Sequence, residues 1–134
     1  MNIYDTYGFK SKDLEKVKKA FEKVVKVSLE KHESNYMGGI YYFQGQTHKE
    51  NYTLQSNYSH EEGWTEEDHK ELGVILYISR SQRSDELRNL LLNSFLGDIL
   101  FIERIVITGD RTYQKYQYID GKDKLVFESN LSSM

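Results

Sequence analysis

The stretch GVILYIS at residues 73–79 decides the fold class, because it predicts a strand in the middle of a sheet. Its apolar residues follow one another without alternating with polar ones. A strand that is apolar on both faces is typical of a central position, where other structure covers the sheet on both sides. The segments before and after it are therefore expected to supply neighbouring strands and covering helices.

Several other segments have the pattern of strands. Residues 2–9 are expected to be extended, and NYTLQSNY at 51–58 alternates strictly, with one face made of polar residues that form hydrogen bonds readily. Towards the C-terminus, Gly109-Asp110 and Asp120-Gly121 are turn residues between strand-like segments. They predict an antiparallel meander over 98–107, 112–119 and 124–129.

Two segments have the apolar spacing of amphipathic helices. Ser11 is the expected N-cap of the first helix, with Asp13 in its first turn. Ser84 is the expected N-cap of the second helix, and Gly97 follows its end. The apolar faces, which we expect to pack on a sheet, consist of Leu14, Val17, Phe21, Val24 and Val25 in the first helix and Leu87, Leu90, Leu91, Leu92, Phe95 and Leu96 in the second.

Strands grouped in meanders with only two helices favour an antiparallel sheet over an alternating parallel fold. The sequence therefore predicts an α+β fold, in which an antiparallel sheet of about six to eight strands carries both helices on one face. The chain has 134 residues and no proline-rich linker or internal repeat. A chain of this length buries about two thirds of its unfolded surface around one core, so residues 1–134 are expected to form a single domain.

The pair Gly38-Gly39 has two interpretations, a phosphate-binding loop or a hairpin turn. A phosphate loop connects a strand to a helix, so that the helix N-terminal amides face the anion. Here the glycines lie between two extended segments that contain tyrosine. A two-residue hairpin turn is favoured, with Tyr36 opposite Tyr41 and Ser34 opposite Phe43.

The composition excludes several classes of protein. There is no cysteine, so disulfides, thiolate nucleophiles and cysteine-based metal sites are excluded. The first twenty residues contain no continuous apolar stretch, so we expect a cytoplasmic protein with neither a signal peptide nor a membrane span. No Walker loop, Rossmann glycine pattern or nucleophile elbow is present, so no cofactor is expected.

Charge is distributed unevenly along the chain. Residues 36–75 hold two lysines and seven acids, and HEEGWTEEDHKE at 60–71 holds six of those acids. Such a segment repels nucleic acid and attracts basic protein surfaces. The alternative interpretation is a solvated loop without a partner.

The histidines do not form a recognisable catalytic or metal site. His60 and His69 with the neighbouring acids lack the i, i+4 spacing of metal ligands, so no metal is expected. A small hydrolase or nuclease that uses His48, Glu50 or His60 is an alternative, although no motif supports it, and we expect no enzymatic activity. Trp64 is the single tryptophan and is flanked by acids, which suggests an interface anchor or a tether for the loop.

The sequence resembles small immunity proteins of bacterial contact-dependent growth inhibition and related polymorphic toxin systems. The resemblance covers roughly residues 10–105, and its motifs are ESNYMGG at 33–39 followed by IYY, ENYTLQSN at 50–57 and the helix start RSDEL at 83–87. The C-terminal meander departs from the pattern, which leaves that part of the chain unassigned. The motifs are structural and specify no catalytic residue.

The resemblance implies a protein that binds one cognate toxin domain, usually a nuclease, and blocks it. An acidic and aromatic surface is suited to a basic toxin, because it supplies both electrostatic steering and contact area. A generic interaction module that pairs through a strand edge is a further alternative. The residues expected to face the toxin are Tyr58, Glu61, Glu62, Trp64, Glu66, Glu67 and Asp68.

Overall fold

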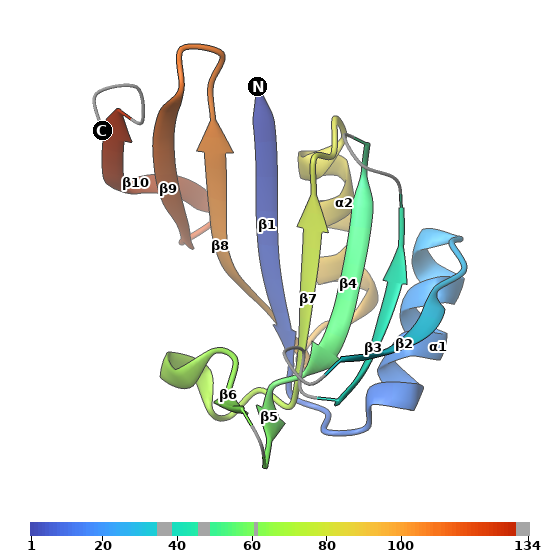
Figure 1. Cartoon of the computed structure of the whole chain (residues 1–134). Helices are drawn as coiled ribbons and strands as arrows, with labels where there is room; N and C mark the ends of the chain where they lie inside the picture. The colour runs from blue at the N-terminus through green and yellow to red at the C-terminus, as the bar shows by residue number, and fades with distance from the viewer. Residues whose placement is uncertain (35–38, 46–48, 61, 131–134) are drawn as a thin grey trace.

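The computed structural model describes residues 1–34, 39–45, 49–60 and 62–130. It contains an eight-stranded antiparallel sheet with the strand order β10-β9-β8-β1-β7-β4-β3-β2 (Figure 1). A second sheet of two short strands, β5 (Tyr58–Ser59) and β6 (Gly63–Trp64), lies between β4 and β7 in the chain. The strands of the large sheet are β1 (Asn2–Phe9), β2 (Glu30–Ser34), β3 (Gly39–Gln44), β4 (Asn51–Ser56), β7 (Val74–Ser79), β8 (Ile99–Ile107), β9 (Thr112–Ile119) and β10 (Lys122–Asn130).

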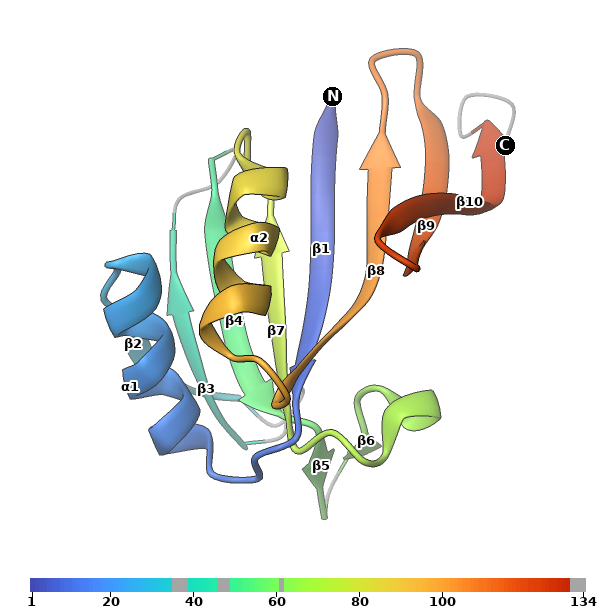
Figure 2. The same ribbon diagram turned by 180° about the vertical axis from the view of Figure 1, so that it is seen from behind.

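Both helices, α1 (Leu14–Val25) and α2 (Ser84–Ser94), pack on the same face of the large sheet (Figure 2). This arrangement confirms the predicted α+β class. We call the other side of the large sheet the open face. The core lies between the helices and the sheet, where side chains such as Phe21 and Leu91 meet alternate residues of the central strands.

The predicted helices are present, but their caps differ from the expectation. The cap of α1 is Asp13, whose carboxylate accepts from the Lys16 amide at 3.1 Å. The Ser11 hydroxyl accepts instead from the Asp13 amide at 3.3 Å. Arg83 holds the N-cap position of α2 without a side-chain cap bond, and Ser84 is the first residue of the helix, with its hydroxyl donating to the Ser81 carbonyl at 3.2 Å.

The apolar face of α2 is narrower than the sequence predicts. Leu87 and Leu91 are fully buried, and Leu92 and Phe95 pack against the edge of the core. Leu90 is largely exposed, and Leu96, which follows the helix, is 79% exposed. Leu87 and Leu91 define the line along which the helix contacts the core, and Leu90 and Leu96 lie beyond it.

The strand β7 lies inside the sheet, between β1 and β4, as the GVILYIS stretch predicts. Val74, Leu76 and Ile78 are buried beneath the helices. On the open face Ile75 is buried, whereas Tyr77 and Ser79 are only half-buried. The expectation that both faces are covered therefore holds only for the first part of the strand.

The β2–β3 hairpin is present, but its register is not the predicted one. Ser34 pairs with Gly39 and His32 pairs with Tyr41, so the pairing is shifted by four positions from the expected Ser34–Phe43 pair. Gly38 and Tyr36 lie outside the described residues. Gly39 has a φ of +100°, which only glycine adopts without strain, and this explains one of the two glycines.

The C-terminal meander forms as predicted and extends the sheet beyond the helices. β10 is the edge strand, and a register shift between Leu125 and Phe127 marks a β-bulge at Val126. The side chains of these three residues are largely exposed, with Phe127 at 53%. A bulge and charged residues are common ways to prevent further pairing at a sheet edge, and β10 begins with the charged sequence KDK at 122–124.

A buried ionic network joins the helix layer to the sheet. Arg104 of β8 makes a bidentate contact with Asp5 of β1, with nitrogen–oxygen distances of 2.8 and 2.9 Å. Its Nη1 also donates to Asp85 of α2 at 2.6 Å. Arg88 of α2 binds both oxygens of Asp123 of β10, at 2.7 and 3.1 Å. The network therefore links three strands of the sheet to α2.

Candidate functional site

The acidic segment predicted to bind a partner lies in an excursion from the sheet, residues 57–73, between β4 and β7 (Figure 1). It contains β5, β6 and the short 3-10 helix η2 (Glu67–His69). We call it the 57–73 segment. It is attached to the end of the sheet away from the N-terminus, so its outer surface is free of the core.

The side chain of Asn57 holds this segment in one conformation. It is fully buried, and its amide nitrogen donates to the carbonyls of His69, at 2.9 Å, and Leu72, at 2.8 Å. Its amide oxygen accepts from the Glu66 backbone N–H at 2.7 Å. The carbonyls and the N–H belong to residues 66, 69 and 72, so one side chain connects the start of the segment to its middle and its end.

Backbone and side-chain bonds complete this attachment. The Asn57 N–H donates to the Gly73 carbonyl at 2.9 Å, and the Thr65 N–H donates to the Asn57 carbonyl at 2.7 Å. On the open face, the Gln55 amide donates to the Thr65 hydroxyl at 3.1 Å. The 57–73 segment is therefore a pre-organised surface, which lowers the entropy cost of binding a partner.

The two aromatic residues of the predicted site lie together. The rings of Tyr58 and Trp64 face each other across the β5–β6 pair with centroids 4.9 Å apart. Tyr58 is 46% exposed and Trp64 is 37% exposed. They form an exposed aromatic pair of the kind that supplies rigid contact area in protein interfaces.

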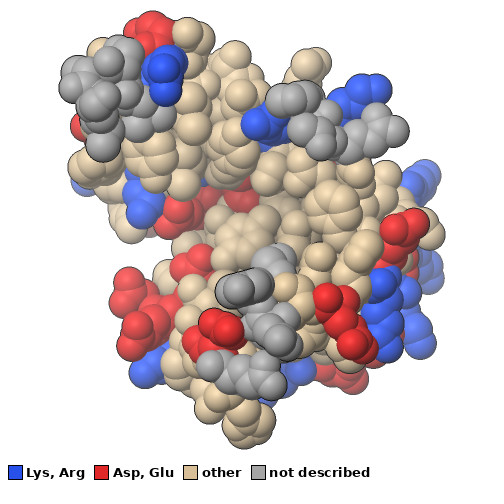
Figure 3. All heavy atoms as spheres, viewed as in Figure 1, with Lys and Arg blue, Asp and Glu red and all other residues tan. Residues whose placement is uncertain are grey.

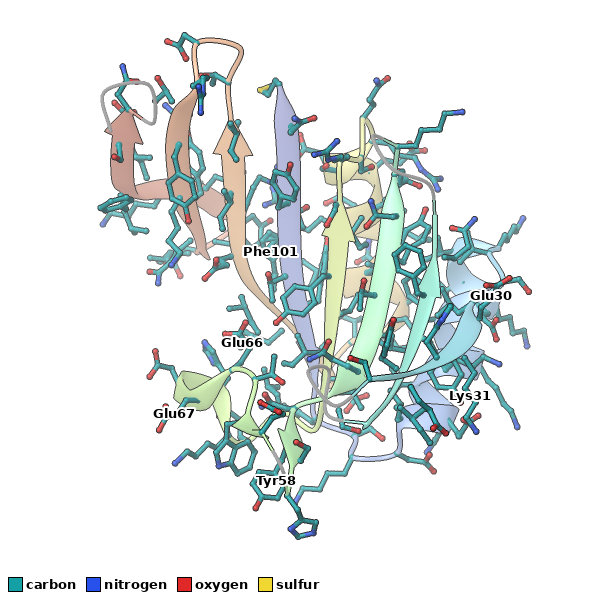
Figure 4. The ribbon with its side chains drawn as sticks, viewed as in Figure 1. Glu30, Lys31, Tyr58, Glu66, Glu67 and Phe101 are labelled. Carbon is teal, nitrogen blue, oxygen red and sulfur yellow. The ribbon has the colours of Figure 1, made fainter. Side chains whose placement is uncertain are left out.

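The predicted acids divide into two groups. Glu62, Glu67 and Asp68 are exposed on the outside of the segment, and we call these three residues the acidic surface. Acidic side chains gather over this part of the molecule in Figure 3. Glu67 points away from the sheet, whereas Glu66 lies on its sheet side (Figure 4). Glu61 lies outside the described residues.

Glu66 therefore does not belong to the acidic surface. Its carboxylate accepts from the Tyr77 hydroxyl at 3.2 Å. Desolvation raises the pKa of Glu66, and the Glu103 carboxylate adds to the rise, although the hydrogen bond from Tyr77 opposes it. Desolvation and the charge of Glu66 also raise the pKa of Tyr77, so its hydroxyl stays protonated.

Glu66 instead lines a groove of about 550 Å³ on the open face. Figure 3 shows this hollow between the 57–73 segment and the strands β8 and β9. Its walls combine tyrosine, threonine and isoleucine side chains with acidic residues, a composition closer to a protein interface than to a core. The lining residues include Tyr4, Thr6, Thr53, Glu66, Tyr77, Glu103, Ile105, Ile107 and Tyr113.

The indole of Trp64 lies among cations rather than acids. Lys70 Nζ lies over the ring, 5.8 Å from its centroid, and Lys12 lines the same pocket. The sequence places acids on both sides of Trp64, but none of the described acids lines the pocket beside its ring. Lys70 was visible in the sequence as the single base of the segment, whereas nothing local indicated Lys12, which is distant in sequence and lies between β1 and α1.

Glu50, which belongs to the alternative interpretation as a hydrolase, is held by hydrogen bonds and by an ion pair with Arg83. It accepts three hydrogen bonds from Arg83, the shortest at 2.9 Å, and others from the hydroxyls of Ser81 and Tyr52. Desolvation favours the neutral acid, but these bonds outweigh it and lower the pKa of Glu50. The group is held as a carboxylate with several donors, which is the reverse of what a general base requires.

The histidines have separate surroundings. His60 packs against the edge of Tyr58, His69 lies 3.4 Å from a Glu71 oxygen, and His32 stacks on Tyr41. His48 lies outside the described residues. Within the described part of the chain, no three His, Asp or Glu side chains gather closely enough to hold a metal ion.

The structure is an α+β protein with an open antiparallel sheet and an excursion that carries acidic and aromatic residues on its surface. Comparison with protein-family models, curated proteins and solved structures gave no match to this chain. Over the residues that the structure describes, neither helix is long and apolar enough to cross a membrane.

Proposed function

We propose that this protein is an immunity protein, which binds and neutralises a cognate bacterial toxin domain through the 57–73 segment. The observation that supports the proposal is the position of this segment. The buried amide of Asn57 fixes it, yet its aromatic pair and its acidic surface point away from the core. A rigid exposed surface of this kind is typical of protein recognition.

The expected partner is a nuclease domain, because a nuclease must attract phosphates and therefore presents basic residues. Glu62, Glu67 and Asp68 would attract such a surface and speed its association. An acidic protein that covers the basic cleft would also exclude nucleic acid from it. The proposal has the complex forming in the cytoplasm, where the nucleic acid substrate of the toxin is found.

The open face supplies a second contact area beside the acidic surface. The groove adjoins the 57–73 segment through Glu66, which belongs to both. A stable protein complex buries about 800 Å² on each partner, which is more than one short excursion provides. The proposed interface therefore extends from the acidic surface onto the groove of the open face.

The first test is protection of living cells. The C-terminal domain of the protein encoded directly upstream is expressed in bacteria with and without this chain, and surviving colonies are counted. Survival that depends on this chain is the expected result. Equal killing in both cultures, with both proteins produced, would contradict the proposal.

The second test measures association of the two purified proteins at low and high salt. The triple variant Glu62→Lys, Glu67→Lys and Asp68→Lys is expected to associate about tenfold more slowly at low salt, because steering is lost. The matched control reverses three exposed acids elsewhere, Glu15, Glu33 and Glu86, and has the same net charge. Equal association rates for both triple variants would exclude the acidic surface as the toxin-facing side.

A further inference from the structure

A pocket of about 260 Å³ lies between the 57–73 segment and the start of α1. Its position differs from that of the groove on the open face, and the two share no lining residue. The residues that give it its character are Lys12, Tyr58, Trp64, Lys70, Leu72 and Gly73. Two are cations, three are apolar or aromatic, and no acid lines the pocket among the described residues.

The walls of the pocket are apolar. The Tyr58 and Trp64 rings, tilted by 52° to each other, form one side. Leu72 is almost fully buried and contributes its side chain to the lining. Since the volume is below the roughly 300–1,000 Å³ that accommodates a drug-sized ligand, the pocket suits a single amino-acid residue.

Two lysines, Lys12 and Lys70, are among the residues that line the pocket. Lys70 Nζ is 5.8 Å from the centroid of Trp64. Gly73 packs directly on the chain at residues 11–12: a Cβ atom at Gly73 would lie 2.4 Å from the Ser11 carbonyl oxygen and 2.6 Å from Lys12 Cα. The backbone of Lys12 is therefore held against the pocket, and Lys12 is one of its lining residues.

We propose that this pocket binds the C-terminal residue of a partner polypeptide. The apolar side chain of that residue packs on Tyr58 and Trp64, and its α-carboxylate lies between Lys12 and Lys70. The two lysines favour an anion, and the aromatic and apolar walls favour an apolar group close to that anion, a combination that a C-terminal residue provides. The inference rests on the proposed function only for the identity of the partner.

Trp64 makes the site measurable, because it is the single tryptophan of the chain and its fluorescence reports on this pocket alone. N-acetyl-leucine is titrated as a probe with a free carboxylate, and N-acetyl-leucinamide as the matched neutral probe. The acid is expected to change the Trp64 emission saturably, with a dissociation constant of roughly millimolar, as suits so few atoms. Equal responses to both probes, or no response to either, would overturn the proposal.

Variants separate this site from general charge effects. Lys12→Gln with Lys70→Gln is expected to weaken binding of N-acetyl-leucine at least about fivefold, since a carboxylate loses both cationic partners. The control Lys19→Gln with Lys23→Gln removes two exposed lysines from α1 and is expected to bind as the wild type does. Unchanged affinity of the Lys12→Gln, Lys70→Gln variant for N-acetyl-leucine would overturn the proposal. The two single substitutions are measured as well, so that one poorly folded variant does not decide the result.

A third probe distinguishes the source of the carboxylate. N-acetyl-glutamic acid α-amide carries its carboxylate on a side chain and has a blocked C-terminus. Tighter binding of this probe than of N-acetyl-leucine would overturn the assignment to a C-terminal residue. None of these titrations contains the toxin, so a negative result would not contradict the proposed function. Failure of the cell-protection test would likewise not contradict binding of a C-terminal residue in this pocket.

Discussion

The buried side-chain amide of Asn57 positions the candidate surface through its hydrogen bonds to the backbone of the 57–73 segment. The strand β4 ends at Ser56, and the next residue turns its amide inward instead of continuing the polar face. Its amide bonds the Leu72 carbonyl, the Glu66 N–H and the His69 carbonyl, and the last of these also accepts from the Leu72 N–H at 3.0 Å. Because an unsatisfied buried polar group costs about 1–3 kcal/mol, this amide is more important than its size suggests.

We predict that Asn57→Ala lowers the free energy of unfolding by about 2–3 kcal/mol, because the Leu72 carbonyl and the Glu66 N–H lose the Asn57 amide and the His69 carbonyl loses one of its two donors. Urea denaturation measures the loss, and limited proteolysis should cut first within residues 57–73. The control is Asn51→Ala, whose amide donates to the Lys49 carbonyl at 3.0 Å at the surface and whose loss should cost less than about 0.5 kcal/mol. Equal losses in the two variants would show that Asn57 does not hold the segment.

Among the secondary-structure elements, the start of β7 and the start of α1 are packed unusually closely. Gly73 precedes β7, and its N–H donates to the Phe9 carbonyl at 2.8 Å. A side chain at this position would meet backbone atoms of residues 11 and 12, which cannot move aside as the end of a long side chain would. The turn from β1 into α1 is therefore fixed by the absence of a side chain at one position.

We predict that Gly73→Ala lowers the free energy of unfolding by about 1–3 kcal/mol, the usual cost of overpacking a well-packed site. The matched control is Gly109→Ala, because a Cβ atom at Gly109 meets no atom within 4 Å. That variant should stay within about 0.5 kcal/mol of the wild type. Thermal unfolding measured on both proteins checks the pair, and a Gly73→Ala protein as stable as the control would contradict the close packing.

Over the whole molecule, the ionic network joins parts of the chain that are far apart in sequence. Asp5 and Arg104 are 99 residues apart and lie opposite each other on β1 and β8. Asp85 and Arg88 bring α2 into the same network, and Asp123 brings in the start of β10. A buried ion pair contributes little net stability when it is intact, but loss of one partner leaves an unpaired charge in the interior.

We predict that Arg104→Ala lowers the free energy of unfolding by about 3–5 kcal/mol, because Asp5 is left buried without its cation. The double variant Asp5→Leu with Arg104→Met should recover most of this loss, since an apolar pair of similar size replaces the ion pair. Lys115→Ala is the control, because it breaks a more exposed pair with Glu103 at 3.4 Å and should cost less than about 1 kcal/mol. A loss at Arg104 no larger than at Lys115 would contradict a structural role for the network.

Much of the fold was predictable, because the decisive patterns are local. The alternation at 51–56, the apolar run at 74–79 and the turn residues at 109–110 and 120–121 each indicate their element from a few neighbouring residues. The site was predictable only in part. Tyr58, Glu62, Trp64, Glu67 and Asp68 are all exposed or partly exposed, as an interface requires, whereas Glu66 turns towards Tyr77.

The sequence by itself determined the α+β class, the two helices and the C-terminal meander, because hydrophobic periodicity and turn chemistry act over short distances along the chain. Only the tertiary structure decided the β2–β3 register, the inward turn of Asn57 and the approach of Lys12 to Trp64. These features depend on contacts between residues that are distant in sequence. Contacts made when the sheet and the helices pack together select these arrangements over the alternatives, so no local sequence pattern predicts them.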